Sequence, residues 1–247
     1  MHTTIIRIEW HGMTLQTDLN LGHCIAIPLD HENAQPNAFF APLYEATPHH
    51  AGVWVGDTRQ GASVNFYNVR INPHGNGTHT ECVGHISSER YSVHQALGCG
   101  RWLAQLISVY PLAQENGDRV LMDLDWESGA EALIVRTLPN HADKKSRIYG
   151  NTNPPYMDSG LARRLADEGI EHLLLDLPSV DREEDGGALL SHKAFWRYPE
   201  NPRLTATITE MIYIDNVIPD GLYLLEIQIP ALELDASPSR PFIYPLK

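Results

Sequence analysis

Three histidines and one carboxylate lie close together in the stretch from Pro73 to His85. The histidines are His74, His79 and His85, and the acid is Glu81. Neutral imidazole and carboxylate are the usual protein ligands of zinc and of neighbouring transition metals. His79 and Glu81 are two residues apart, so on an extended segment their side chains point to the same side. The stretch therefore predicts a metal site. The alternative is a polar surface loop rich in turn residues.

The stretch also resembles a known signature. Gly77-Thr78-His79, Glu81 and His85 are in register with the pattern Gly-Thr-His-x-(Asp/Glu)-x-x-x-His of the metal-dependent cyclase family, whose best-known members are bacterial kynurenine formamidases. The resemblance implies an α/β fold with a central, barrel-like mixed sheet flanked by helices. It also implies a homodimer or larger homo-oligomer and one cyclase-like domain over residues 1–247.

Three positions depart from the family's usual pattern. Glu81 stands where the family usually has aspartate, and Val83 stands where it usually has proline. Gly75 occupies the place of the family's first histidine, and His74 lies one residue earlier. The extra methylene of Glu81 moves its carboxylate outward, while metal–oxygen distances tolerate only about 0.2 Å. We therefore expect a rearranged site that holds one or two ions per chain.

Two further metal ligands are implied by segments later in the chain. The run 176–181 resembles the family's Asp-x-Pro-Ser-x-Asp segment, and His192 and Glu210 match the ligands that follow it. Taken alone, His192 is a histidine in an apolar segment and is more often structural. Glu210 is more informative, because a carboxylate on an apolar strand face must be paired, hydrogen-bonded or metal-bound. The apolar residues expected on the same face of the strand as Glu210 are Ile208, Ile212 and Ile214.

These residues predict a metal-dependent amidohydrolase. Bound Zn²⁺ or Mn²⁺ lowers the pKa of water and polarises a carbonyl, and an amide needs both. The resemblance implies a small N-formyl arylamine or cyclic amide as the substrate, and it suggests that Trp54 helps to wall the substrate pocket. His85 is the candidate proton shuttle, with Glu210 also at the reacting centre. The alternatives are a structural role for His85 and, for the whole chain, a non-catalytic metal- or ligand-binding protein on the same fold.

Composition excludes several other classes. The formal charge of −13 argues against nucleic acid as a partner. No apolar run approaches the roughly 20 residues of a membrane helix, and the first residues lack the pattern of a signal peptide.

The cysteines are scattered along the chain, at Cys24, Cys82 and Cys99. This pattern predicts reduced thiols and a cytoplasmic setting rather than a disulfide framework. We find no Gly-x-Ser-x-Gly elbow, phosphate-binding loop or dinucleotide fingerprint. Nucleophilic catalysis by Cys82 is poorly motivated.

Residue periodicity predicts many strands and few helices. A helix is expected to begin at Asp158 or Ser159 and to end at Gly169. The run 30–61 contains several prolines and aromatics, and it reads as a long irregular segment. Strands are expected at 3–10, 13–18, 25–28, 63–71, 101–110, 119–125, 133–137, 170–176, 206–214 and 222–229.

Overall fold

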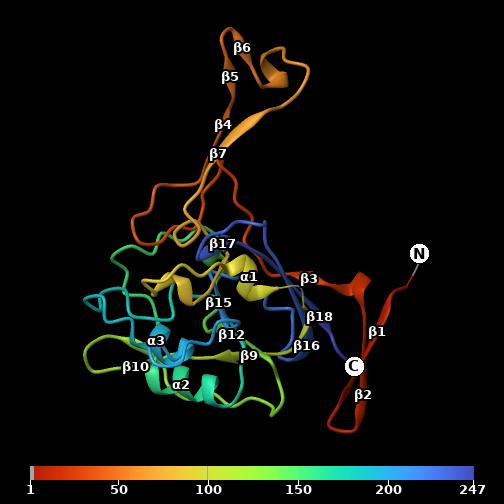
Figure 1. The fold of residues 1–247 in the computed structure, drawn as a ribbon, viewed down its shortest axis with the longest axis vertical. Helices are drawn as coiled ribbons and strands as arrows, with labels where there is room; N and C mark the ends of the chain where they lie inside the picture. The colour runs from red at the N-terminus through yellow and green to blue at the C-terminus, as the bar shows by residue number, and fades with distance from the viewer. Residues whose placement is uncertain (1–2, 99) are drawn as a thin grey trace.

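The computed structural model describes residues 3–98 and 100–247 and centres on a nine-stranded mixed sheet (Figure 1). Met1, His2 and Cys99 lie outside the described residues. Strands β9, β12, β14 and β15 run parallel in the middle, and the others join antiparallel. The order across the sheet is β17 (Ala236–Pro238), β8 (His79–Glu81), β15 (Thr207–Glu210), β14 (His172–Leu175), β12 (Ala132–Thr137), β9 (Trp102–Val109), β16 (Gly221–Gln228), β18 (Arg240–Pro245) and β3 (His23–Cys24).

Two helices cover one face of this sheet. They are α2 (Ser159–Asp167) and α3 (Leu190–Trp196), and both contribute to one buried apolar cluster with the central strands. Asp158 caps α2, as predicted, by accepting hydrogen bonds from the next backbone amides. A second buried apolar cluster is separate from the one that contains α2 and α3. It includes Leu97 of α1 (Val93–Leu97). The curled mixed sheet with few helices confirms the predicted α/β class.

The first two strands form a hairpin beside the C-terminus (Figure 1). They are β1 (Ile5–Trp10) and β2 (Met13–Asp18), and His11 and Gly12 form the turn with positive φ angles. Backbone hydrogen bonds between Gln16 and Lys247 fasten the hairpin to the end of the chain. The alternating pattern and the His-Gly turn predicted this hairpin correctly.

Part of the segment expected to be irregular is a projecting arm (Figure 1). Its base is β4 (Glu45–Pro48) paired with β7 (Tyr67–Arg70), and its end is β5 (His50–Ala51) paired with β6 (Trp54–Val55). The prediction of an irregular segment was wrong here because β4 pairs with β7, a strand outside that segment. Large apolar side chains are exposed along the arm: Val53, Trp54, Val64, Phe66 and Val69.

Two other predicted strands differ from the expectation, one being shorter and one reduced to a single bridge. The predicted strand 119–125 is ordered only as β11 (Arg119–Leu121), in a small sheet with β10 (Leu112–Ala113) and β13 (Tyr156–Met157). The predicted strand 25–28 contributes only an isolated bridge from Ala26 to Ile212. Short 3-10 turns are η1 (Leu19–Leu21), η2 (Thr58–Gln60), η3 (Val83–His85) and η4 (Ala142–Ser146). Within the described ranges, no helix is long and apolar enough to cross a membrane.

Candidate metal centre and active site

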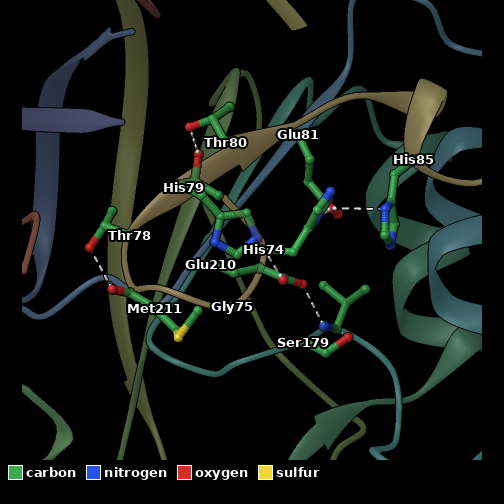
Figure 2. A network of polar contacts seen from close by, with 12 residues as sticks. His74, Gly75, Thr78, His79, Thr80, Glu81, His85, Ser179, Glu210 and Met211 are labelled. Carbon is green, nitrogen blue, oxygen red and sulfur yellow. Dashed lines mark hydrogen bonds and ion pairs between the residues drawn. The ribbon is translucent and has the colours of Figure 1, made fainter. Parts of the chain in front are cut away.

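The candidate site is built on the pairing of β8 with β15. His79 lies directly opposite Glu210 in the antiparallel register, so the two side chains share one face of the sheet. Nε2 of His79 lies 3.4 Å from Oε2 of Glu210. Glu81 is two residues further along β8 and points to the same side, as the sequence predicted (Figure 2).

The Gly-Thr-His motif fixes the orientation of His79. Gly77 has a φ of 104°, which favours glycine, and its carbonyl accepts a hydrogen bond from Nδ1 of His79 at 2.9 Å. The hydroxyl of Thr78 donates to the carbonyl of Met211 at 2.6 Å, just beyond the end of β15 (Figure 2). Nε2 of His79 is therefore left facing Glu210.

The structure leaves no room for a side chain at Gly75. A Cβ atom on Gly75 would lie 2.3 Å from Cβ of Ala41, so a side chain does not fit there without a shift of the backbone. A turn closed by the carbonyl of Asn72 instead places His74 at the site. Nδ1 of His74 lies 3.0 Å from Oε2 of Glu81. The histidine that is out of register in the sequence is in contact in space.

His192 enters from the first turn of α3. Asp181 accepts hydrogen bonds from the backbone amides of Ser191 and His192, at 2.7 and 3.2 Å, and so holds the start of the helix. The same carboxylate accepts a hydrogen bond from Nδ1 of His192 at 2.6 Å. Nε2 of His192 therefore faces inward and lies 3.0 Å from Oε1 of Glu81.

Glu81 lies at the centre of the cluster and is fully buried. Burial opposes its charged form, but His85, His192 and His74 outweigh burial and hold the pKa of Glu81 well below its usual range. For both His74 and His192, burial opposes the imidazolium, but the carboxylates around each ring outweigh it and raise the pKa to about 10.

His85 and Asp235 lie at the more open side of the cluster. Nδ1 of His85 is 3.9 Å from Oε2 of Glu81 and 3.5 Å from Oδ2 of Asp235. Its side chain is 29% exposed, whereas that of His192 is 3% exposed. His85 can therefore exchange protons with a bound molecule or with solvent.

The donor set fits a divalent cation. Nε2 of His79 is buried without a well-aligned hydrogen bond, 3.4 Å from Oε2 of Glu210, which is costly unless another group satisfies it. Oε2 of Glu81 is equally buried and lies 3.0 Å from Nδ1 of His74. Two groups of ligand atoms lie close enough to hold an ion, and they share Glu81. One is His74, Glu81 and His85, and the other is His79, Glu81 and Glu210. Imidazoles and carboxylates from separate segments, without a cysteine pair, suit a catalytic metal.

The structure thus brings together His74, His79, Glu81, His85, His192 and Glu210. Trp54 lies apart from them. It is in β6, at the tip of the arm, and the tip projects away from β15 and β17 (Figure 1). Sequence reasoning assigned no role to Asp181 or Asp235, although both contact the histidines. The run 176–181 resembles the family's segment, and this resemblance could have identified Asp181 as a site residue. No feature of the sequence marks Asp235 as one.

Comparison with known proteins identifies relatives and solved structures that this chain resembles. The kynurenine formamidase of Bacillus cytotoxicus is 27% identical over 209 residues, which cover 78% of this chain and 91% of that protein. A predicted metal-dependent hydrolase from Bacillus stearothermophilus superposes with a TM-score of 0.59 at 16% identity, covering 90% of this chain and 97% of that one. Isatin hydrolase A from Labrenzia aggregata superposes with a TM-score of 0.60 at 13% identity, covering 91% of this chain and 94% of that one.

The two solved structures are too distant in sequence to establish more than a shared fold. The family model described as "Putative cyclase" matches residues 25–182, which hold the Gly-Thr-His motif and Asp181. Because the matched region spans more than half of the chain, the family assignment does not depend on any one relative. This chain belongs to the putative cyclase family.

Proposed function

We propose that this protein is a metal-dependent hydrolase of a small amide, with residues 1–247 acting as one catalytic domain. The observation that carries the proposal is the burial of Glu81 and Glu210 among inward-facing imidazole nitrogens. The 27% identity to a kynurenine formamidase supports an amide as the scissile group. An N-formyl arylamine or a cyclic amide is the substrate class we infer.

His79, Glu81, Glu210, His192 and His74 are the residues that would hold Zn²⁺ or Mn²⁺. The two candidate ligand groups share Glu81, so this carboxylate would contribute to either of them. A cation bound there would polarise the substrate carbonyl and lower the pKa of an attacking water. Asp181 and the carbonyl of Gly77 keep the nitrogens of His192 and His79 aimed at that position.

His85 supplies the proton transfer in this proposal. It is part-exposed at the edge of the cluster, and its Nδ1 faces the carboxylates of Glu81 and Asp235. It takes a proton from the attacking water and returns it to the leaving nitrogen. This step matters because an amine leaves only after protonation.

A substrate panel with metal analysis tests the proposal. We expect the Zn²⁺- or Mn²⁺-loaded protein to hydrolyse at least one N-formyl arylamine or small cyclic amide, and a chelator to abolish this activity reversibly. The number of ions per chain is measured on the same preparation. Stoichiometric metal without turnover on formamides, cyclic amides or esters would instead support a non-catalytic binding protein.

We further propose that Trp54 acts on the site of a second copy of the chain. A two-stranded arm is marginally stable alone in water, and the exposed aromatics at its end form an apolar surface that a partner can cover. In a symmetric dimer, each arm then closes the partner's site. This arrangement reconciles the inferred substrate contact of Trp54 with its distance from the metal cluster of its own chain.

Mixing two variants tests this arrangement. Trp54→Ala and Glu210→Gln are each expected to have low activity. After exchange of subunits, half of the dimers are mixed, and each holds one intact site, so activity should rise to about a quarter of the wild-type value. Light scattering reports the oligomeric state. A monomer, or mixtures no more active than the sum of the parts, contradicts the proposal. Phe40→Ala, at an exposed aromatic outside the arm, is the control.

A further inference from the structure

Each histidine of the buried cluster is held in the same way, with one nitrogen fixed from outside and the other facing inward. Nδ1 of His79 contacts the carbonyl of Gly77, and Nε2 faces Glu210. Nδ1 of His192 contacts Asp181, and Nε2 faces Glu81. In metal sites, such outer acceptors fix the ring orientation and the tautomer of the ligand.

His74 completes this pattern through Asp235. Nε2 of His74 lies 2.8 Å from Oδ2 of Asp235, and Nδ1 lies 3.0 Å from Oε2 of Glu81. The ring therefore lies between two carboxylates, one outside the cluster and one at its centre. If Nε2–H donates to Asp235, the lone pair of Nδ1 is left for a metal beside Glu81.

The fold places Asp235 independently of this contact. Asp235 precedes β17, which pairs with β8, and its carbonyl accepts a hydrogen bond from the amide of Cys82 at 3.0 Å. A Cβ atom on Gly84 would lie 3.2 Å from Cβ of Asp235, so the chain fits closely at this point. The backbone that carries Glu81 thus also fixes the position of the carboxylate that holds His74.

Resting on the proposed metal-dependent function, we propose that Asp235 is a positioning residue that makes His74 a metal ligand through Nδ1. The same oxygen lies 3.5 Å from Nδ1 of His85, so Asp235 also holds the rim histidine next to His74. The rings of His74 and His85 have centroids 4.2 Å apart.

Metal affinity in a double-mutant cycle tests this role without reference to activity. Asp235→Asn keeps the size of the side chain but removes its charge, and it is expected to weaken Zn²⁺ binding by about 10- to 100-fold, the usual cost of losing such an outer acceptor. Affinity is measured by competition with a chromophoric chelator. Glu233→Gln, at a nearby exposed acid that contacts Gln95, is the matched control and should change affinity by less than about twofold.

The background variant His74→Ala separates positioning from other roles. If Asp235 acts through His74, Asp235→Asn should cause no further loss of Zn²⁺ affinity in His74→Ala. An equal loss in both backgrounds would show that Asp235 ligates the ion itself or acts through the fold, and would overturn the proposal. So would unchanged affinity in the single variant. A wild-type protein that binds no Zn²⁺ would reject the metal site as a whole, whereas failure of Asp235 alone would leave the proposed function standing.

Discussion

Replacing His79 by alanine is expected to weaken Zn²⁺ binding by more than about 100-fold. The loss of a residue that only orients a ligand already costs about 10- to 100-fold, and the loss of the ligand itself should cost more. His79 is fully buried, and its inward nitrogen lies 3.4 Å from Glu210 without a well-aligned hydrogen bond. The variant removes the imidazole that lies 3.4 Å from Glu210, and the next imidazole, that of His192, is 3.9 Å away. Metal content after dialysis and competition with a chelator measure the effect, and hydrolysis should fall in parallel.

Two controls make this result interpretable. His79→Gln fills most of the same volume, so it separates the loss of a ligand from the creation of a cavity in the core. His141→Ala removes an exposed histidine and should retain the wild-type metal content. Thermal unfolding of the metal-free proteins checks that each variant is folded. A folded His79→Ala protein with unchanged metal content would remove the basis of the proposed metal centre.

The central part of this site was predictable because it depends on local patterns. His79 and Glu81 share one side of a strand through their spacing alone. Glu210 stood out because it lies on a strand face that is otherwise apolar, where an acid needs a partner. In the structure that partner is His79, directly opposite on the neighbouring strand, together with the backbone amide of Val180 at 2.8 Å.

The rest of the site depends on contacts between distant segments. The exclusion of a side chain at Gly75 comes from Ala41, in a segment with no recognisable pattern. Asp235 reaches His74 only because β17 pairs with β8. A single acid before a short strand resembles any solvated surface residue, so one sequence cannot identify it. Close packing and strand register carry this information.

The same limit explains the error in the arm. Proline-rich sequence between residues 30 and 61 predicted irregular structure, yet Pro48 lies at the end of β4 and pairs with Tyr67 of β7. Proline is tolerated at the edge of a ladder because the partner does not need its missing amide hydrogen. Local composition therefore did not reveal the pairing that makes part of this segment an arm.

His85→Ala is expected to lower kcat by about 10²- to 10⁴-fold, the usual contribution of a positioned general acid–base group. Unlike His79, His85 lies at the rim, 3.9 Å from Glu81 and with a part-exposed ring. Metal affinity should therefore change little, because the buried ligand group His79, Glu81 and Glu210 remains intact. This separation of turnover from metal binding distinguishes a proton shuttle from a ligand.

Rescue by added imidazole provides a further test of His85. A small base that enters the space left by the ring can carry the proton, so imidazole should restore part of the lost kcat in His85→Ala and none in His79→Ala. The rescue should increase with pH as free imidazole loses its proton near its ordinary pKa. Full activity in His85→Ala would make His85 structural. Loss of metal together with activity would instead place His85 among the ligands, as its position beside His74 and Glu81 also allows.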